Sequence, residues 1–507
     1  MISPSLNVSV WRKILPFFYS LLIGLGGVIL GRMLVSIPDQ WEVTILLSGL
    51  LFYPVLRYPV VGVYFIFAVL PFVPYFRKLY YLMYQRPSVD PLIILGDVTA
   101  AMVIGGLYFV FKERREYDYP VRKYTRLITI YLVYVVLRSF LYNELGPREG
   151  ILQIRFYVPQ ALMFFAGIVF AQNRRFVANI FKITVAVAVI AALYGLKQLY
   201  LGYSEAERIW FSSISFNSLF IDGSARPFSF FQSPASFADY MQIAVFSLLV
   251  LVQASRSRIR HVFLLFLPLF CYAILITSVR SNWAGVFLSL FIWYIFLDIK
   301  GNRKRIGLVA AVFLAFAAIN FFEEAFQAGM NPVSFVRFLA GGSSSNSMVN
   351  TLIFERMGAV VNPFQEHSML SRITLWKYVF SLSIDPFLAV LGRGTGAMNV
   401  DSLYVNYLAE FGYPGLVFIS GLTILFIYKG FYCIDNAADP VISAFVKGIT
   451  AFNITFAVMN LTGTHIHAFP GDTFFWFLNG ILIKLASLTG SGKSQNEAIA
   501  CDTRFPA

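Results

Sequence analysis

Charged side chains are scarce in this sequence. Asp, Glu, Lys and Arg make up 13% of its 507 residues, against roughly 25% in soluble domains. Hydrophobic residues make up 58% and aromatic residues 17%. A soluble fold cannot bury so much apolar surface, so the scarcity of charge excludes a soluble protein. The composition predicts an all-α polytopic membrane protein.

Cysteine and histidine are also rare. The three cysteines, Cys271, Cys433 and Cys501, lie far apart in the chain, which argues against a disulfide framework and against a cysteine-based metal site. Two of the four histidines form the H-x-H pair His465 and His467, which lacks a third metal ligand in the sequence around it. We therefore predict no metal and no cofactor.

Acidic residues are outnumbered by basic ones. The chain has 40 Lys and Arg against 26 Asp and Glu, a formal charge of +14. In a soluble protein this excess would raise the question of nucleic acid. Here the basic residues lie in short connections between apolar segments, where they set orientation and contact anionic head groups. The expected partners are membrane lipids and not nucleic acid.

Long apolar segments run through most of the chain. A helix needs about 20 residues to cross roughly 30 Å of hydrocarbon, and the segments predict about 12–14 transmembrane helices. The second segment is marginal and lowers the count if it is re-entrant. The candidate spans are residues 14–37, 41–56, 59–76, 90–111, 124–142, 154–172, 176–200, 236–254, 261–279, 282–299, 305–322, 402–428, 441–461 and 471–488.

Basic clusters give these spans one orientation. Arg12 and Lys13 predict a cytoplasmic N-terminus by the positive-inside rule. If every span crosses, the same side receives the basic residues of segments 112–126, 173–175, 255–261 and 300–305. Residues 77–86 are an exception, with basic residues on the outer side. The loops predicted to face outward are 201–235, 279–281, 323–401 and 462–470.

The spans divide the chain into five parts. We expect N-terminal transmembrane helices over 1–175, central ones over 176–322, a large outer loop over 323–401, C-terminal helices over 402–488, and a disordered cytoplasmic tail over 489–507. The outer loop is predicted to contain short amphipathic helices. One of them begins near Arg372, carries Trp376 and Val379 on one side, and ends at Asp385-Pro386.

Four outward-facing residues are the main candidates for chemistry. Arg226, Arg280 and Arg372 can bind phosphate bidentately and keep their charge at any working pH. Asp401 can accept a proton from a hydroxyl nucleophile. Other interpretations stay open: an arginine at a span end can extend to head groups, and Asp401 can cap the helix that begins at Ser402, for about 1 kcal/mol.

Further outward-facing side chains are candidates for lining a vestibule or binding an acceptor. Asp472, at the start of the last span, could instead cap that helix. The full set is His367, Arg393, Tyr404, His465, His467 and Asp472.

Several motifs in order resemble one family. They are RPFSFFQSPASFADYM (226–241), TSVRSNWAG (277–285), SRITLW (371–376), LGRGTGAMNVDSLYVNYLAEFGYPGL (391–416) and FPGDTFFWFLNGIL (469–482). Over residues 170–485 the chain resembles the bacterial O-antigen ligase and polymerase superfamily of polytopic membrane glycosyltransferases, in motif order and in its large loop late in the chain.

The resemblance implies a site on the periplasmic face of the bacterial inner membrane. Arg226, Arg280 and Arg372 would hold the diphosphate of an undecaprenyl-linked saccharide donor. The family usually places a histidine where this chain has Asp401, so Asp401 would orient or deprotonate the acceptor hydroxyl. The implied activity is metal-independent, inverting polymerisation of O-antigen or exopolysaccharide, with a chain-length regulator or flippase of the same pathway as possible protein partners.

Two alternatives remain. A ligase would pass finished polysaccharide to a lipid A core or another acceptor. A solute or inorganic-carbon transporter would place ionisable residues at mid-depth on broken helices. The spans carry few such residues, and most lie near span ends: Asp97, Arg138, Lys182 and Glu410 are among them.

Overall fold

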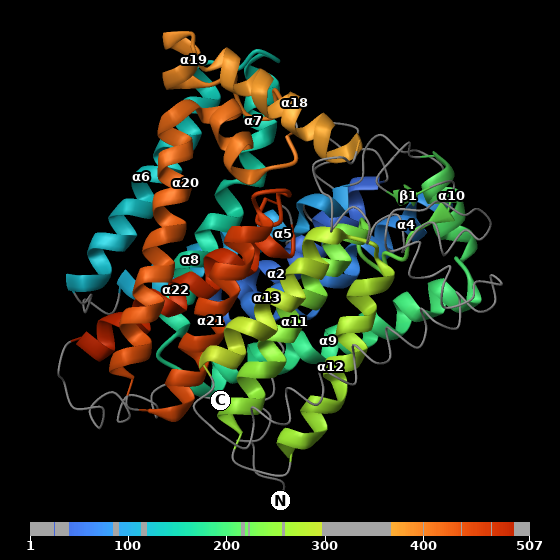
Figure 1. Ribbon diagram of the computed structural model, residues 1–507, viewed down its shortest axis with the longest axis vertical. Coiled ribbons are helices and arrows are strands. Elements are labelled where there is room, and N and C mark those ends of the chain that lie inside the picture. Colours follow the sequence, from blue (N-terminus) through green and yellow to red (C-terminus); the bar gives the residue numbers. More distant parts are fainter. Residues whose placement is uncertain are drawn as a thin grey trace, which may run out of the picture.

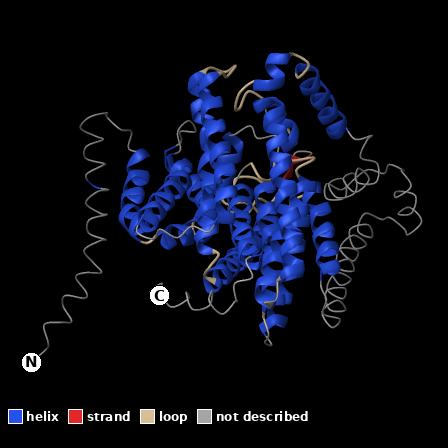
Figure 2. Ribbon diagram, turned by 90° about the vertical axis from the view of Figure 1, so that its left-hand side faces the viewer, coloured by secondary structure: helices blue, strands red, loops and turns tan. Residues whose placement is uncertain are grey.

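The computed structural model describes residues 40–84, 91–112, 119–213, 219–221, 224–255, 259–296, 367–398, 400–437, 439–467 and 469–490, together with residue 25. Within these ranges the chain is helical apart from loops and one short hairpin, in which β1 (Phe220–Ile221) pairs antiparallel with β2 (Ser224–Ala225). Figures 1 and 2 show helices throughout, with loops at their ends. The predicted all-α class is confirmed.

The N-terminal half is built of helices that are often interrupted. Short 3₁₀ turns, η1 (Leu70–Phe72), η2 (Pro91–Ile94) and η3 (Ile154–Phe156), separate or precede several of them. The helices are α2 (Gln40–Arg57), α3 (Pro59–Ala68), α4 (Val73–Tyr84), α5 (Leu95–Lys112), α6 (Tyr119–Leu141), α7 (Pro147–Gln153), α8 (Val158–Phe170), α9 (Arg174–Leu201) and α10 (Glu205–Ser213).

The C-terminal half holds longer helices and two short ones. In chain order they are α11 (Pro234–Ala254), α12 (Ile259–Ile276), α13 (Arg280–Phe296), α18 (His367–Leu382), α19 (Pro386–Leu391), α20 (Leu403–Asn436), α21 (Pro440–Met459) and α22 (Gly471–Gly490). A helix is present where one was predicted to begin near Arg372, as α18, but it begins at His367 and its apolar residues do not gather on one face. Asp385 caps the next helix, α19, by accepting a hydrogen bond from Phe387 N at 2.8 Å.

Six helical segments in the described ranges are long and apolar enough to cross a membrane. They are Pro59–Leu79, Pro147–Phe170, Arg174–Leu201, Pro234–Ala254, Leu403–Asn436 and Pro440–Met459, and shorter apolar helices cover Thr44–Arg57, Leu95–Phe109 and Val262–Ile276. All agree with predicted spans. The predicted spans 14–37 and 305–322, residues 323–366 of the outer loop and the tail from residue 491 lie outside the described residues.

Helix α11 is the centre of the bundle. Of its apolar 18-residue window, 89% is buried, because α9, α12, α13 and α21 pack around it (Figure 1). Nearby, α8 and α22 approach each other closely at Gly167 and Gly480. A Cβ atom at either glycine would overlap with backbone of the other helix. Small residues permit this contact, as is common between membrane helices.

One residue of the basic exception at 77–86, Lys78, has a structural explanation. Lys78 lies in α4, not in a loop, and is 1% exposed. Its Nζ donates to Phe231 O at 2.6 Å and lies 4.0 Å from the centre of the Phe228 ring. The Lys78 side chain therefore contacts groups inside the protein, and its charge does not indicate which side of the membrane this segment faces.

Candidate functional site

Arg372 and Asp401 form an ion pair. Arg372 Nε lies 3.2 Å from Asp401 Oδ2, although the residues are 29 positions apart. Val379 of α18 holds the helix in place by packing into a small apolar cluster with Val400 and Leu408. The Asp401 side chain remains 61% exposed. A carboxylate beside a guanidinium group is therefore accessible at the start of α20.

Asp401 is not the cap of α20. The N-cap is Ser402, and its side chain makes no capping bond. The first amide of the helix, Leu403 N, instead donates to Asn460 O at 3.1 Å and to Gly463 O at 3.0 Å. The Asp401 carboxylate bonds Arg372. The geometry thus does not support the capping interpretation of Asp401.

Arg226 is held beside the turn that leads to Arg280. Arg226 Nη1 donates to Thr277 O at 3.3 Å and to Ser278 O at 3.4 Å. Arg280 is the first residue of α13, two positions after Ser278. Two of the three predicted arginines therefore lie on segments that contact each other, although they are 54 residues apart in the chain (280 − 226).

A buried triad joins the loop between α21 and α22 to this region. His465 Nδ1 lies 2.7 Å from Asp239 Oδ1, and Asn282 Nδ2 donates to the same oxygen at 2.8 Å. His465, Asp239 and Asn282 are 6%, 5% and 0% exposed. The His465 Nε2 atom faces Gly463 and has no hydrogen-bond partner among the residues that the structure describes. Sequence reasoning missed Asp239 and Asn282, although an aspartate inside an apolar span is a signal of function.

These contacts bring four helix starts to one end of the bundle. Asp239 lies near the start of α11 and Asn282 near the start of α13. His465 precedes α22, and the loop that carries it receives the first amide of α20. Helix N-termini carry partial positive charge. Arg226, Arg280 and Arg372 lie on segments that these contacts link to one another.

Arg393 and Tyr404 make contacts that fix the backbone. Arg393 Nε donates to Glu144 at 2.7 Å, and this bond raises the pKa of Arg393 against the opposing effect of burial. Arg393 N also donates to Ala409 O at 2.7 Å, which fastens the Gly-rich turn to α20. Tyr404 OH donates to Ala457 O at 3.1 Å. His367 begins α18.

His467 faces aromatic side chains. Its ring centre lies 4.7 Å from that of Tyr157 and 6.5 Å from that of Phe156. Burial in this environment lowers the pKa of His467 to about 4. The imidazole is therefore neutral at ordinary pH and is not a site of positive charge.

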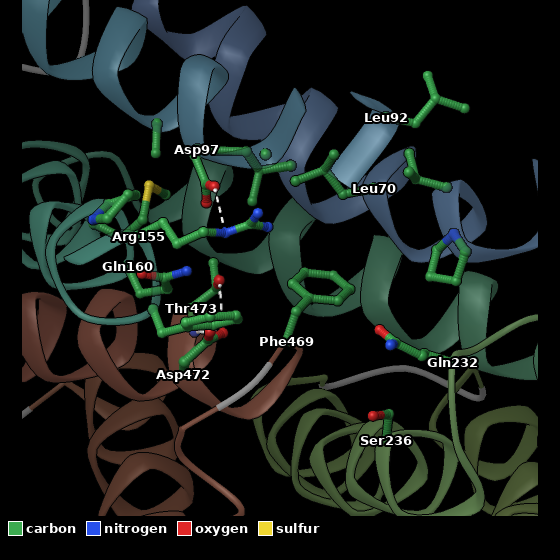
Figure 3. Close-up of a pocket in the computed structure, with 18 of the residues that line it drawn as sticks. Leu70, Leu92, Asp97, Arg155, Gln160, Gln232, Ser236, Phe469, Asp472 and Thr473 are labelled. Carbon is green, nitrogen blue, oxygen red and sulfur yellow. Dashed lines mark hydrogen bonds and ion pairs between the residues drawn. The ribbon is translucent and has the colours of Figure 1, made fainter. Parts of the chain in front are cut away.

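A cavity of about 180 Å³ opens beside the same loop. Asp472 lines it and is 2% exposed, and its hydrogen bonds come only from neighbouring Thr473. Asp97 Oδ2 lies 3.5 Å from Arg155 Nε across the cavity wall. Figure 3 shows these side chains and Gln160 directed toward one another. The predicted vestibule residue Asp472 thus lines a cavity whose wall is mostly apolar and also holds Asp97, Arg155 and Gln160, which the sequence did not place beside it.

Within the described ranges, no group of three His, Cys, Asp or Glu side chains is placed to hold a metal ion. Comparison of the sequence with models of known protein families and with curated proteins gives no match. Any functional assignment therefore depends on the chemistry of the residues themselves.

Proposed function

We propose that this protein polymerises a cell-surface polysaccharide. It would transfer a saccharide from an undecaprenyl-diphosphate-linked donor to an acceptor hydroxyl at the outer face of a bacterial inner membrane. The observation that carries the proposal is the accessible Arg372–Asp401 pair at the start of α20. It lies at the end of the bundle where Arg226 and the Arg280 segment also meet.

The residue types fit the two halves of such a reaction. Guanidinium groups bind a diphosphate bidentately, and helix N-termini add to the attraction. The acceptor oxygen would attack the anomeric carbon, the bond from that carbon to the diphosphate oxygen would break, and Asp401 would take the hydroxyl proton. Charge on the departing diphosphate would be balanced by the arginines. A single displacement of this kind inverts the anomeric centre.

A ligase would use the same donor half of the site with a different acceptor. The Arg372–Asp401 geometry supports both activities equally, because it concerns the diphosphate and the hydroxyl and not the rest of the acceptor. Polymerase remains our proposal because the chain has Asp401 where ligases of the resembling superfamily more regularly have histidine.

The cavity favours transport of a small solute as a second candidate. Its ionisable side chains Asp97, Arg155 and Asp472 lie beside interrupted helices. Transporters place substrate sites at such interruptions. The cavity is separate from the Arg372–Asp401 pair in its lining residues, so this candidate does not explain the exposed arginine and carboxylate.

The test is a reaction with purified full-length protein in lipid vesicles. The substrate is a synthetic undecaprenyl-diphosphate oligosaccharide, and the products are separated on a gel and by chromatography. We expect longer lipid-linked saccharides together with free undecaprenyl diphosphate. Transfer only to added lipid A core would replace polymerase by ligase. If neither product forms while the vesicles accumulate a labelled solute, transport is the function.

A further inference from the structure

We propose that the cavity beside Asp472 binds one sugar ring. The proposal extends the proposed function, on which it rests for the origin of that ring. The cavity is bounded by the interruptions of the bundle: Leu70 lies in η1, Leu92 in η2 and Arg155 in η3. Ser236 and Asp472 enter from the first turns of α11 and α22. Broken helices that converge on one cavity are typical of small-molecule sites in membrane proteins.

The charges of the lining favour a neutral ligand. Two carboxylates, Asp97 and Asp472, are matched by two guanidinium groups, Arg77 and Arg155. Asp97 and Arg155 already form an ion pair at 3.5 Å. The carboxylates would therefore repel a free anion, and the guanidinium groups would repel a free cation. A ligand with hydroxyl groups can donate to the carboxylates and accept from the guanidinium groups at once.

The rest of the wall is mostly apolar, with amide, hydroxyl and aromatic groups at a few positions. Gln160 Oε1 is buried and accepts no hydrogen bond from any described part of the chain, which leaves an acceptor for a hydroxyl donor. Gln232 and Ser236 stand on the opposite side, with Phe469 between the two groups in Figure 3. An aromatic face beside planar polar side chains suits the apolar face and hydroxyl edge of a pyranose.

The size limits the ligand to about one ring. A volume of about 180 Å³ is below the roughly 300–1,000 Å³ of cavities that enclose drug-sized ligands. Ser236 lies about one helical turn before Asp239 on α11, and Asp239 bonds His465 and Asn282. A ring bound in the cavity would thus lie near the start of α11, which the Asp239–Asn282 hydrogen bond joins to the start of α13 at Arg280. The terminal sugar of a lipid-linked acceptor would need such a position.

The experiment measures protection of an engineered cysteine. Ser236→Cys is introduced into full-length protein with Cys501→Ser, since Cys271 and Cys433 are buried. The rate of reaction with a small thiosulfonate is followed with glucose, galactose, mannose or N-acetylglucosamine, and with glycerol at equal osmolarity. At a sugar concentration about ten times the dissociation constant, the rate should fall about tenfold, because only the unoccupied fraction reacts. Ser381→Cys on exposed α18 should show no protection.

A second variant tests whether protection of the cysteine by sugar depends on a residue that lines the cavity. Gln160→Leu, combined with Ser236→Cys, should react at the same rate without sugar and lose the protection by sugar. A cysteine that does not react, or that every sugar leaves equally reactive, overturns the assignment.

Two further measurements decide whether the ring belongs to a free sugar or to a lipid-linked saccharide. Uptake of the protecting sugar into vesicles would show a free sugar as the source and would count against glycosyl transfer. Shorter polymer from Gln160→Leu, with no uptake by the parent protein, would assign the ring to a lipid-linked saccharide. If a sugar protects the cysteine but the parent protein forms no polymer, the cavity binds sugar and the proposed function is wrong.

Discussion

Arg372 Nε contacts Asp401 Oδ2 at 3.2 Å and thereby joins α18 to the residue that precedes α20. The pair is partly exposed, with 28% of the arginine and 61% of the aspartate side chain accessible. An exposed ion pair contributes only about 0–1 kcal/mol to stability. Its charges remain accessible to a ligand, and a role in chemistry can therefore be tested apart from a role in folding.

Asp401→Asn should leave the fold intact and reduce polymerisation. Asparagine has no useful proton affinity, and loss of a general base typically costs about 10²- to 10⁴-fold in rate. Asp401→His should retain more activity than Asp401→Asn. The measurement is polymer length on a gel in a deletion strain at matched protein level. Asp385→Asn is the control, since asparagine caps α19 about as well as aspartate. Wild-type ladders from Asp401→Asn would exclude a base at this position.

Arg280→Lys should lose most polymerisation activity at normal expression. Arg280 begins α13, next to the turn that Arg226 contacts. A lysine keeps the charge but cannot present the two parallel donors of a guanidinium group to a diphosphate. Arg208→Lys provides a matched control on α10, where the side chain is exposed. Equal activity of both variants would remove Arg280 from the donor site.

Helix positions could be predicted from the sequence because a membrane imposes length and polarity on each segment. The predicted span 236–254 matches α11, and 441–461 matches α21. The interruptions were missed. Spans 59–76 and 154–172 each contain a break, although Pro71 and Pro159 are signals against a continuous helix.

The site could be predicted only in part. Three arginines and Asp401 were predicted from residue type and loop position. The structure pairs Arg372 with Asp401 and places Arg226 against the turn before Arg280, and the role of these residues stays a prediction. The Asp239–His465 contact spans 226 positions and depends on how α11 packs against the α21–α22 loop. Local patterns carry no information on such packing. The cavity was missed for the same reason.

Arg138→Met should destabilise the protein. Arg138 is 1% exposed on α6, and its guanidinium group donates to the carbonyl oxygens of Leu391, Tyr142 and Gly392, the last at 3.0 Å. Each buried carbonyl left without a donor costs about 1–3 kcal/mol. We expect a lower apparent melting temperature in detergent. Arg122→Met, exposed on the same helix, should have no effect. Equal apparent melting temperatures of the Arg138→Met and Arg122→Met variants would contradict a structural role for Arg138.

Single cysteines at Ser344 and Ser257 should be labelled from opposite sides of the membrane. The expectation follows from the basic clusters, which predict a cytoplasmic 255–261 connection and an outward 323–401 loop. The measurement is labelling of whole cells by an impermeant thiol reagent, before and after permeabilisation. Cys501→Ser in both variants removes the background labelling of the tail. Labelling of both positions from one side would reject the orientation and, with it, an outward-facing site.

Acidification should destabilise the protein through His467. Burial against Tyr157 and Phe156 lowers the pKa of His467 to about 4 in the folded state, whereas the unfolded value is near 6.5. The unfolded chain therefore binds the proton more readily, and stability present above about pH 6.5 is lost as the pH falls toward 4. Apparent melting temperatures measured at about pH 7.5 and about pH 5 report this loss. His467→Phe keeps an aromatic ring without a titrating group, so its melting temperature should fall less between the two values. An equal fall in wild type and His467→Phe would place the titrating group elsewhere.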